Sequence, residues 1–292
     1  MTKNINLDNE LNIMVALDLT RMDPILLQYV SYLTTVWKVN HLYFTHNIKQ
    51  SKLYNLYEDF LKDDITVEDI VERELERSVK ENYKGNAAHT VVITSDNYTE
   101  SILGHMAKEY DIDLVVLGNK DEFQGTGALP QKLVRMLNTH LLLVPEDARH
   151  RFQKVLVPID FSSNSAKAFS AARSLVHSDK GEIQALHVYN IPSFYFPYID
   201  TRKAHDKTHS HLHARFNQYK KKYRLSDDVE FKHIDREDLS VVKVIEREAE
   251  KGEFDIILMT ARGGNNITSL FIGSITNDLL LVNRTMPLLV VK

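Results

Sequence analysis

An internal repeat limits this chain to a small set of folds. Residues 13–18 match residues 155–160, and residues 114–118 match residues 256–260, in both cases at an offset of 142 residues. A period this long is that of a whole module, whereas solenoid repeats recur every 20–50 residues or so. The chain of 292 residues is also longer than a usual single domain. Two modules in tandem are therefore expected.

The boundary between the modules falls in a short polar segment that begins at Pro145, as a linker commonly does. We place the first module at residues 1–147 and the second at 151–292. Each ends in a short apolar run, at 141–144 and 288–291, which reads as the closing strand of its module. Because unpaired edges invite pairing, we expect the modules to cover each other's edges as an intramolecular pseudo-dimer. A homodimer of the whole chain stays open.

Within each module, short apolar runs alternate with longer segments of helical periodicity. In the second module the expected strands are 154–159, 183–189, 229–234, 254–260 and 287–291, and the expected helices are 164–178, 203–223, 238–250 and 274–284. Alternating strands and helices indicate parallel sheets with right-handed crossovers and helices on both faces. The predicted fold class is α/β, with two tandem doubly wound, Rossmann-like modules.

Composition excludes several classes of function. The net charge of −4 argues against nucleic acid or an anionic membrane as the main partner. The absence of cysteine excludes disulfides, thiolate catalysis and cysteine-ligated zinc. No apolar run approaches the roughly 18 residues needed to span a bilayer, and residues 1–12 lack a signal-peptide core. We expect a cytoplasmic protein.

The C-terminal stretch contains the residues best suited to bind a ligand. A buried strand near 254–260 is followed by the glycine turn Gly263-Gly264, and Gly273-Ser274 opens a helix for which Ser274 is the expected cap. A glycine turn after a strand, followed by a free helix N-terminus, is a place to hold phosphate. In parallel sheets, ligands bind beyond the carboxyl ends of the strands. Asp160, Val188 and Thr260 are all expected at such ends.

The spacing from Gly263 to Gly273-Ser274 resembles the G-x2-G-x9-G-[S/T] signature of the ATP-binding branch of the universal stress protein family, with Thr260 at the first glycine position. The resemblance implies the adenine-nucleotide alpha-hydrolase-like variant of this fold. It also implies contacts to adenine and ribose near the ends of the first two strands, and phosphate contacts in the glycine segment. The implied nucleotide-binding residues are Pro158, Asp160, Val188, Met259, Thr260, Arg262, Gly263, Gly273, Ser274 and Ile275. The implied ligand is ATP, with Mg²⁺ as an optional companion at Asp160.

The first module departs from this signature. Gly127 follows Gly118 by nine residues, whereas Gly273 follows Thr260 by thirteen. The acidic pair at 121–122 would also place negative charge where phosphates should lie. We expect a degenerate site there and a structural or regulatory role for the module.

Catalytic motifs are missing from the sequence. It contains neither the G-x4-G-K-[ST] of P-loop enzymes nor the G-x-S-x-G of a nucleophile elbow. Nothing in the pattern positions a base and an attacking water. A dedicated enzyme is not expected, although slow ATP hydrolysis stays open.

A histidine cluster in the expected helix 203–223 suggests a metal. His205, His209 and His213 recur every four residues, so they share one helix face. Two imidazoles at this spacing can ligate Zn²⁺, with a carboxylate or water completing the tetrahedron. The alternative is a solvated face without any ligand. The family resemblance does not include this cluster.

The sequence therefore predicts a tandem universal stress protein that binds ATP in its second module. The family implies a role in stress resistance as a nucleotide-responsive binding protein, acting on a protein partner that the sequence does not identify. Two alternatives differ in class. One is an interaction scaffold whose site is empty because Thr260 narrows the phosphate loop, and the other is a metal-binding protein that uses the histidine helix.

Overall fold

The computed structural model describes residues 7–49, 61, 65–120, 128–176, 181–192, 195, 198, 200–263 and 272–292. The chain divides into two compact units between His150 and Arg151, and we call them unit 1 and unit 2. The acidic pair at 121–122, Gly127 and Gly264 lie outside the described residues.

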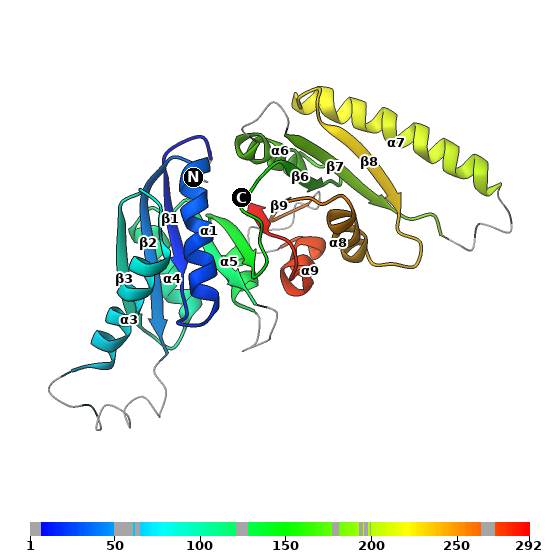
Figure 1. The fold of residues 1–292 in the computed structure, drawn as a ribbon. Helices are drawn as coiled ribbons and strands as arrows, with labels where there is room; N and C mark the ends of the chain where they lie inside the picture. The colour runs from blue at the N-terminus through cyan, green and yellow to red at the C-terminus, as the bar shows by residue number, and fades with distance from the viewer. Residues whose placement is uncertain are drawn as a thin grey trace. The chain divides into compact units, whose positions relative to one another are not determined.

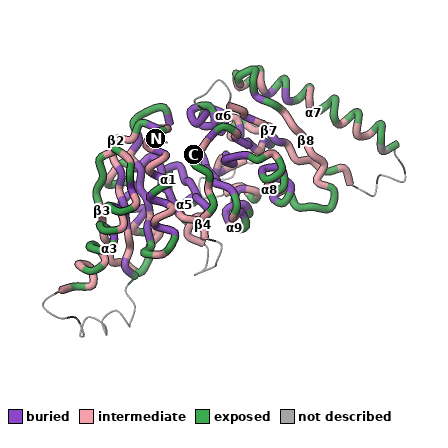
Figure 2. The backbone as a smooth tube through the Cα atoms, in the orientation of Figure 1, coloured by how far each residue is buried: buried purple, intermediate pink, exposed green. Residues whose placement is uncertain are grey.

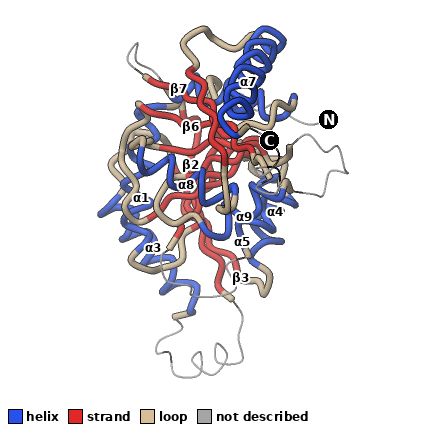
Figure 3. Tube along the Cα trace, turned by 90° about the vertical axis from the view of Figure 1, so that its right-hand side faces the viewer, coloured by secondary structure: helices blue, strands red, loops and turns tan. Residues whose placement is uncertain are grey.

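Unit 1 is a parallel sheet with helices on both faces. Its elements are β1 (Leu11–Ala16), α1 (Met22–Val36), β2 (Val39–Ile48), α3 (Val67–Asn82), β3 (His89–Ser95), α4 (Thr99–Glu109), β4 (Leu114–Asn119), α5 (Leu129–Met136) and β5 (His140–Pro145). The strand order is β3-β2-β1-β4-β5, and the neighbouring strands pair in parallel. Helices α1 and α3 lie on one side of this sheet, and α4 and α5 lie on the other (Figure 3).

Unit 2 repeats this order. Its elements are β6 (Lys154–Pro158), α6 (Ser163–Leu175), β7 (Glu182–Tyr189), α7 (Thr201–Tyr223), β8 (Glu230–Asp235), α8 (Val241–Lys251), β9 (Ile256–Thr260), α9 (Ser274–Val282) and β10 (Leu288–Val291) (Figure 1). The strand order is β10-β9-β6-β7-β8, again with parallel pairs. The first strand of the unit, β6, therefore lies at the centre, and the direction of strand order reverses between β6 and β9.

The predicted fold class is confirmed in both units, and each strand and helix predicted for unit 2 is present within a few residues of its expected bounds. The central strands are buried on both faces, which explains why they read as continuous apolar runs rather than as alternating ones. Ile13, Met14 and Val15 of β1 are completely buried, as are Ile256 and Ile257 of β9. Figure 2 shows these buried positions along the strands, in contrast to the exposed outer side of α7.

Three helices of unit 2, α6, α7 and α8, begin at side-chain caps. Ser162, Asp200 and Ser240 each accept a hydrogen bond from a backbone amide three residues later, at 3.1–3.2 Å. Helix α9 differs from the prediction that Ser274 caps it. Ser274 is the first helical residue and Gly273 is the N-cap, with extended backbone and no side chain to cap the helix.

The repeat also appears in unusual backbone conformations. Leu19 and Phe161, which are 142 residues apart, both have positive φ, at 57° and 62°. Asp111 and Glu253, at the same offset, have φ of 48° and 52°. Positive φ costs energy for a residue with a Cβ atom. The same strained turns therefore follow β1 and β6, and the same strained turns precede β4 and β9.

A buried aspartate ties two strands together at equivalent places in the two units. Asp113 Oδ2 accepts a hydrogen bond from the Asn12 backbone amide at 2.9 Å. Its equivalent, Asp255 Oδ2, accepts from the amides of Gln153 at 2.9 Å and Lys154 at 3.0 Å. These contacts join the start of β1 to the start of β4, and the start of β6 to the start of β9.

Among the described helices, none combines the length and the apolar character that a membrane crossing requires.

We expect replacement of Asp255 by alanine to lower the free energy of unfolding of unit 2 by about 2–4 kcal/mol, because the part-buried amides of Gln153 and Lys154 lose their buried acceptor. Urea denaturation followed by circular dichroism measures this loss. The matched control is Asp228→Ala, which removes an ion pair between Asp228 and Arg173 whose side chains are 55% and 44% exposed. This change should cost less than about 1 kcal/mol. Equal effects of the two substitutions would contradict the role given to Asp255.

Candidate functional site

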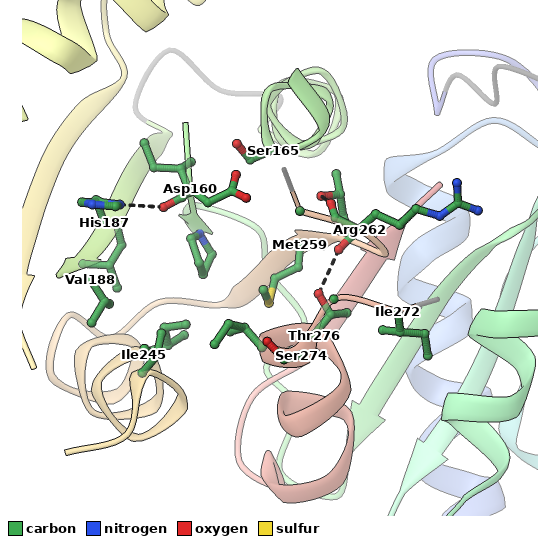
Figure 4. Close-up of a pocket in the computed structure, with 18 residues that line it drawn as sticks. Asp160, Ser165, His187, Val188, Ile245, Met259, Arg262, Ile272, Ser274 and Thr276 are labelled. Carbon is green, nitrogen blue, oxygen red and sulfur yellow. Dashed lines mark hydrogen bonds between the residues drawn. The ribbon is translucent and has the colours of Figure 1, made fainter. Parts of the chain in front are cut away.

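A cavity of about 800 Å³ opens at the carboxyl ends of the strands of unit 2, where the strand order reverses (Figure 4). All ten residues that the sequence selects line this one cavity: Pro158, Asp160, Val188, Met259, Thr260, Arg262, Gly263, Gly273, Ser274 and Ile275. They come from β6, β7, β9, the loop after β9 and the start of α9. The structure therefore brings together residues that are up to 117 positions apart in the sequence, from Pro158 to Ile275.

Eight further residues line the same cavity without having been selected from the sequence: Ile159, Ser165, Leu186, His187, Val241, Ile245, Ile272 and Thr276. Val241 and Ile245 are one turn apart on α8, so the sequence indicates that they share a face. It does not indicate that this face meets the cavity. His187 is the ionisable residue in this group, and it had no recognisable motif around it.

Asp160 places a carboxylate two residues beyond the end of β6. Its Oδ1 accepts a hydrogen bond from the Ser162 amide at 3.0 Å, which orients the group at the rim of the cavity. The loop after β9 passes so close that a Cβ atom at Gly263 would lie 2.7 Å from Asp160 Oδ2. Only glycine fits there without moving the carboxylate. Asn164 Nδ2 donates to the Gly263 carbonyl at 2.9 Å and holds the loop in this position.

Thr260 uses its hydroxyl to brace the loop. Its Oγ1 donates to the Arg262 carbonyl at 2.7 Å, and its own carbonyl accepts from Thr276 Oγ1 at 2.9 Å. The threonine at the first glycine position of the motif thus links β9, the loop and the start of α9. The Arg262 side chain extends away from Asp160 and Val188 (Figure 4).

The N-terminus of α9 faces the cavity. The Gly273 amide donates to the Ala261 carbonyl at 2.9 Å, and no side chain caps the helix. The first turn also carries no acidic residue. Amides at a helix N-terminus carry a partial positive charge and bind anions well. This end of the cavity is therefore suited to a negatively charged group.

His187 lies at the opposite end of the cavity wall. Its Nδ1 contacts the Ile159 carbonyl at 2.9 Å, and because a carbonyl can only accept, Nδ1 carries the proton. Burial, as the largest cause, lowers the pKa of His187, while the bond to Ile159 opposes that shift. The imidazole is therefore held neutral, with Nε2 as an acceptor.

Apolar side chains form the wall between these polar ends. They include Leu186 and Val188 of β7, Ile245 of α8 and Met259 of β9. A cavity with an apolar middle and a few convergent polar groups is the usual form of a small-molecule site.

Unit 1 fills the equivalent position differently. Asp18, the counterpart of Asp160, forms an ion pair with Lys120, the counterpart of Arg262. At Gly118, the counterpart of Thr260, an added Cβ would lie 2.4 Å from Met22 Cγ, so the Met22 side chain packs directly on this backbone. The carboxylate and the strand end in unit 1 are therefore occupied by side chains of the unit itself.

The histidines of α7 are only partly grouped as the sequence suggests. His209 and His213 come together with His233 of β8, and their candidate ligand nitrogens all lie within 4.8 Å of one another. His205, one turn before His209, is not in this group within the described part of the chain. His233 lies 20 residues beyond His213, so helix periodicity could not reveal it.

We expect the His187 imidazole to titrate below its ordinary pKa of 6.5, because burial disfavours its charged form. Above about pH 6.5 the imidazole is mostly neutral in the folded and in the unfolded protein, so it does not reduce stability. As the pH falls from there through the lower pKa of the folded protein, the unfolded protein binds the proton more readily, and the free energy of unfolding decreases. NMR titration of the His187 ring measures the midpoint. The His187→Gln variant should lose less stability than the wild type between pH 7.5 and 5.5. A midpoint at or above 6.5 would rule out the buried, neutral imidazole.

Comparisons with known proteins agree with this geometry. The model of the universal stress protein family matches residues 151–292. No curated protein matches the chain by sequence. Among solved structures, a universal stress protein from Archaeoglobus fulgidus aligns over 96% of this chain and 98% of its own, with 15% identity and a TM-score of 0.61. A functionally unknown protein from Pseudomonas aeruginosa aligns over 98% of this chain and 94% of its own, with 13% identity and a TM-score of 0.66.

A universal stress protein solved in complex with cAMP aligns over 46% of this chain and 96% of its own, with 17% identity and a TM-score of 0.31. The alignments with the first two structures cover both units, so each unit has the fold found in those structures. The family match itself covers the unit that carries the cavity. Residues 151–292 are therefore a domain of the universal stress protein family, and unit 1 repeats the fold of that domain.

Proposed function

We propose that unit 2 binds an adenine nucleotide, ATP together with Mg²⁺, and that the chain acts in the stress response as a nucleotide-responsive binding protein. One observation carries the proposal: the ten residues selected by the nucleotide motif all line a single cavity of about 800 Å³. Cavities of roughly 300–1,000 Å³ are the usual size for small-molecule sites.

The chemistry of the wall matches the three parts of a nucleotide. The apolar middle, with Val188 and Ile245, suits a flat base. The Asp160 carboxylate suits the two ribose hydroxyls, which donate hydrogen bonds to it. The uncapped N-terminus of α9, at Gly273 and Ser274, suits the phosphates.

Thr260 is compatible with this proposal. Its hydroxyl is bonded to the carbonyl of Arg262 and so turns back into the loop. With the threonine in place, the cavity has a volume of about 800 Å³. This favours a nucleotide site over the alternative of a scaffold with a phosphate loop narrowed by Thr260.

The proposal is for binding rather than dedicated turnover. The ionisable residues along the described wall are Asp160, His187 and Arg262. His187 has its Nδ1 proton committed to the Ile159 carbonyl, and Arg262 extends away from the centre. Phosphate release from ATP should therefore be slow compared with that of a dedicated ATPase, whose turnover commonly exceeds about 1 s⁻¹.

Isothermal titration calorimetry of the full chain with ATP and Mg²⁺ tests the proposal. We expect one site per chain with a Kd in the micromolar range, about −8 kcal/mol. Gly273→Val should abolish binding, because its branched side chain would stand at the phosphate end. The fold should persist, since Gly273 has φ −60° and ψ 142° and a Cβ there would be 3.4 Å from its nearest neighbour, the Gly263 amide nitrogen.

Equivalent carboxylates in the two units supply a matched control. Asp160→Asn should weaken ATP binding at least tenfold, because a carboxylate acceptor for the ribose is lost, a change of about 1.4 kcal/mol. Asp18→Asn should leave the affinity unchanged, because Asp18 is paired with Lys120 in unit 1. Wild-type protein that gives no heat with ATP would favour the scaffold, and equal loss in both variants would place the nucleotide elsewhere.

A further inference from the structure

Helix α7 and strand β8 of unit 2 bring together three imidazoles, none of which lines the strand-end cavity. Helix α7 runs alongside β8 (Figure 1). His209 and His213, one helical turn apart, have ring centroids 4.4 Å apart. The His233 ring of β8 lies 4.9 Å from that of His209 and 5.4 Å from that of His213. The candidate ligand nitrogens of the three residues all lie within 4.8 Å of one another.

We propose that His209, His213 and His233 form a binding site for a zinc ion. Three imidazoles with an open fourth position for water or another donor are an established zinc arrangement in proteins. With zinc–nitrogen distances of about 2.0–2.1 Å, nitrogens in a tetrahedron lie about 3.3 Å apart. Small rotations of the side chains reach that geometry from separations of up to 4.8 Å. His209 is exposed and has room to rotate.

A solvated histidine face does not account for His233. Its Nδ1 is buried and has no hydrogen-bond partner among the residues that the structure describes. A buried polar atom without a partner is costly, and such atoms are rare in folded proteins. Coordination of a metal through this nitrogen would supply the missing interaction.

The ligand set selects the class of ion. Imidazole nitrogen binds borderline ions such as Zn²⁺ and disfavours Ca²⁺ and Mg²⁺, which prefer oxygen. The site does not use the carboxylate of Asp160, and its formation does not require the nucleotide. Metal binding and nucleotide binding can therefore be tested separately.

The test is a zinc titration of the full chain, prepared without a histidine tag and stripped of metal with a chelator that is then removed. Competition with a chromophoric zinc indicator measures stoichiometry and Kd. We expect one zinc ion per chain in the wild type. His209→Ala and His233→Ala should each weaken binding more than about 100-fold, because even outer-shell changes at metal sites cost 10–100-fold.

Two histidines of the same helix serve as matched controls. His211→Ala, at an exposed position outside the group, should bind zinc like the wild type. His205→Ala should also bind normally, whereas a site made by α7 alone would lose affinity. Circular dichroism of the metal-free variants checks the fold, and His209, being exposed, keeps the test valid if His233→Ala unfolds.

Cobalt provides a second measurement. Co²⁺ in a tetrahedral nitrogen site gives visible absorption bands that an octahedral aquo ion lacks, so the wild type should develop these bands and His233→Ala should not. The proposal is overturned if the wild type takes up no zinc. It is also overturned if folded His233→Ala binds zinc as tightly as the wild type.

Discussion

The buried carboxylate of Asp255 sets the register on which the rest of unit 2 depends. It accepts hydrogen bonds from the amides of Gln153 and Lys154 at the start of β6. Because β6 and β9 are parallel, fixing their first residues also fixes how far each strand reaches at the other end. Asp160 and Thr260 thereby emerge at the same edge of the sheet. The contact of Asp255 at the start of the strands thus helps to fix the positions of Asp160 and Thr260 at their carboxyl ends.

Close approach at that edge explains the pattern of glycines in the motif. A Cβ at position 263 would lie 2.7 Å from Asp160 Oδ2, so a larger residue there would push the carboxylate aside. At position 260 the threonine fits, and its hydroxyl adds one hydrogen bond, to the Arg262 carbonyl. The bond from Thr276 goes to the backbone carbonyl of Thr260, which a glycine would supply equally well. Loss of a glycine from a family motif therefore matters only where the backbone meets another group at short range. At Thr260 it strengthens the loop and leaves the cavity open.

The sequence predicts those parts of the structure that depend on local pattern. Continuous apolar runs predict the central strands, and the family resemblance, which rests on Gly263 and Gly273-Ser274, implies ten of the residues that line the cavity. The expected start of the last helix, at Ser274, is confirmed, but its cap was wrong: the N-cap is Gly273, because an extended glycine can precede a helix without a capping side chain. Ile245 and His233 were missed for a different reason. Their partners are brought to them by helices packing on a sheet, which no periodicity within one segment records.

The ion pair between Asp18 and Lys120 gives unit 1 a permanent internal occupant. A tethered ammonium group is present at the carboxylate at an effective concentration that dilution cannot change. A ligand that binds Asp18 must first displace this ammonium group, so its apparent affinity is weaker than it would be for a free carboxylate. The repeated module has therefore acquired a built-in competitor in one copy, while the other copy leaves its carboxylate beside a cavity. The two units therefore differ in what lies against the equivalent carboxylate, a lysine of the unit itself in one and a cavity in the other.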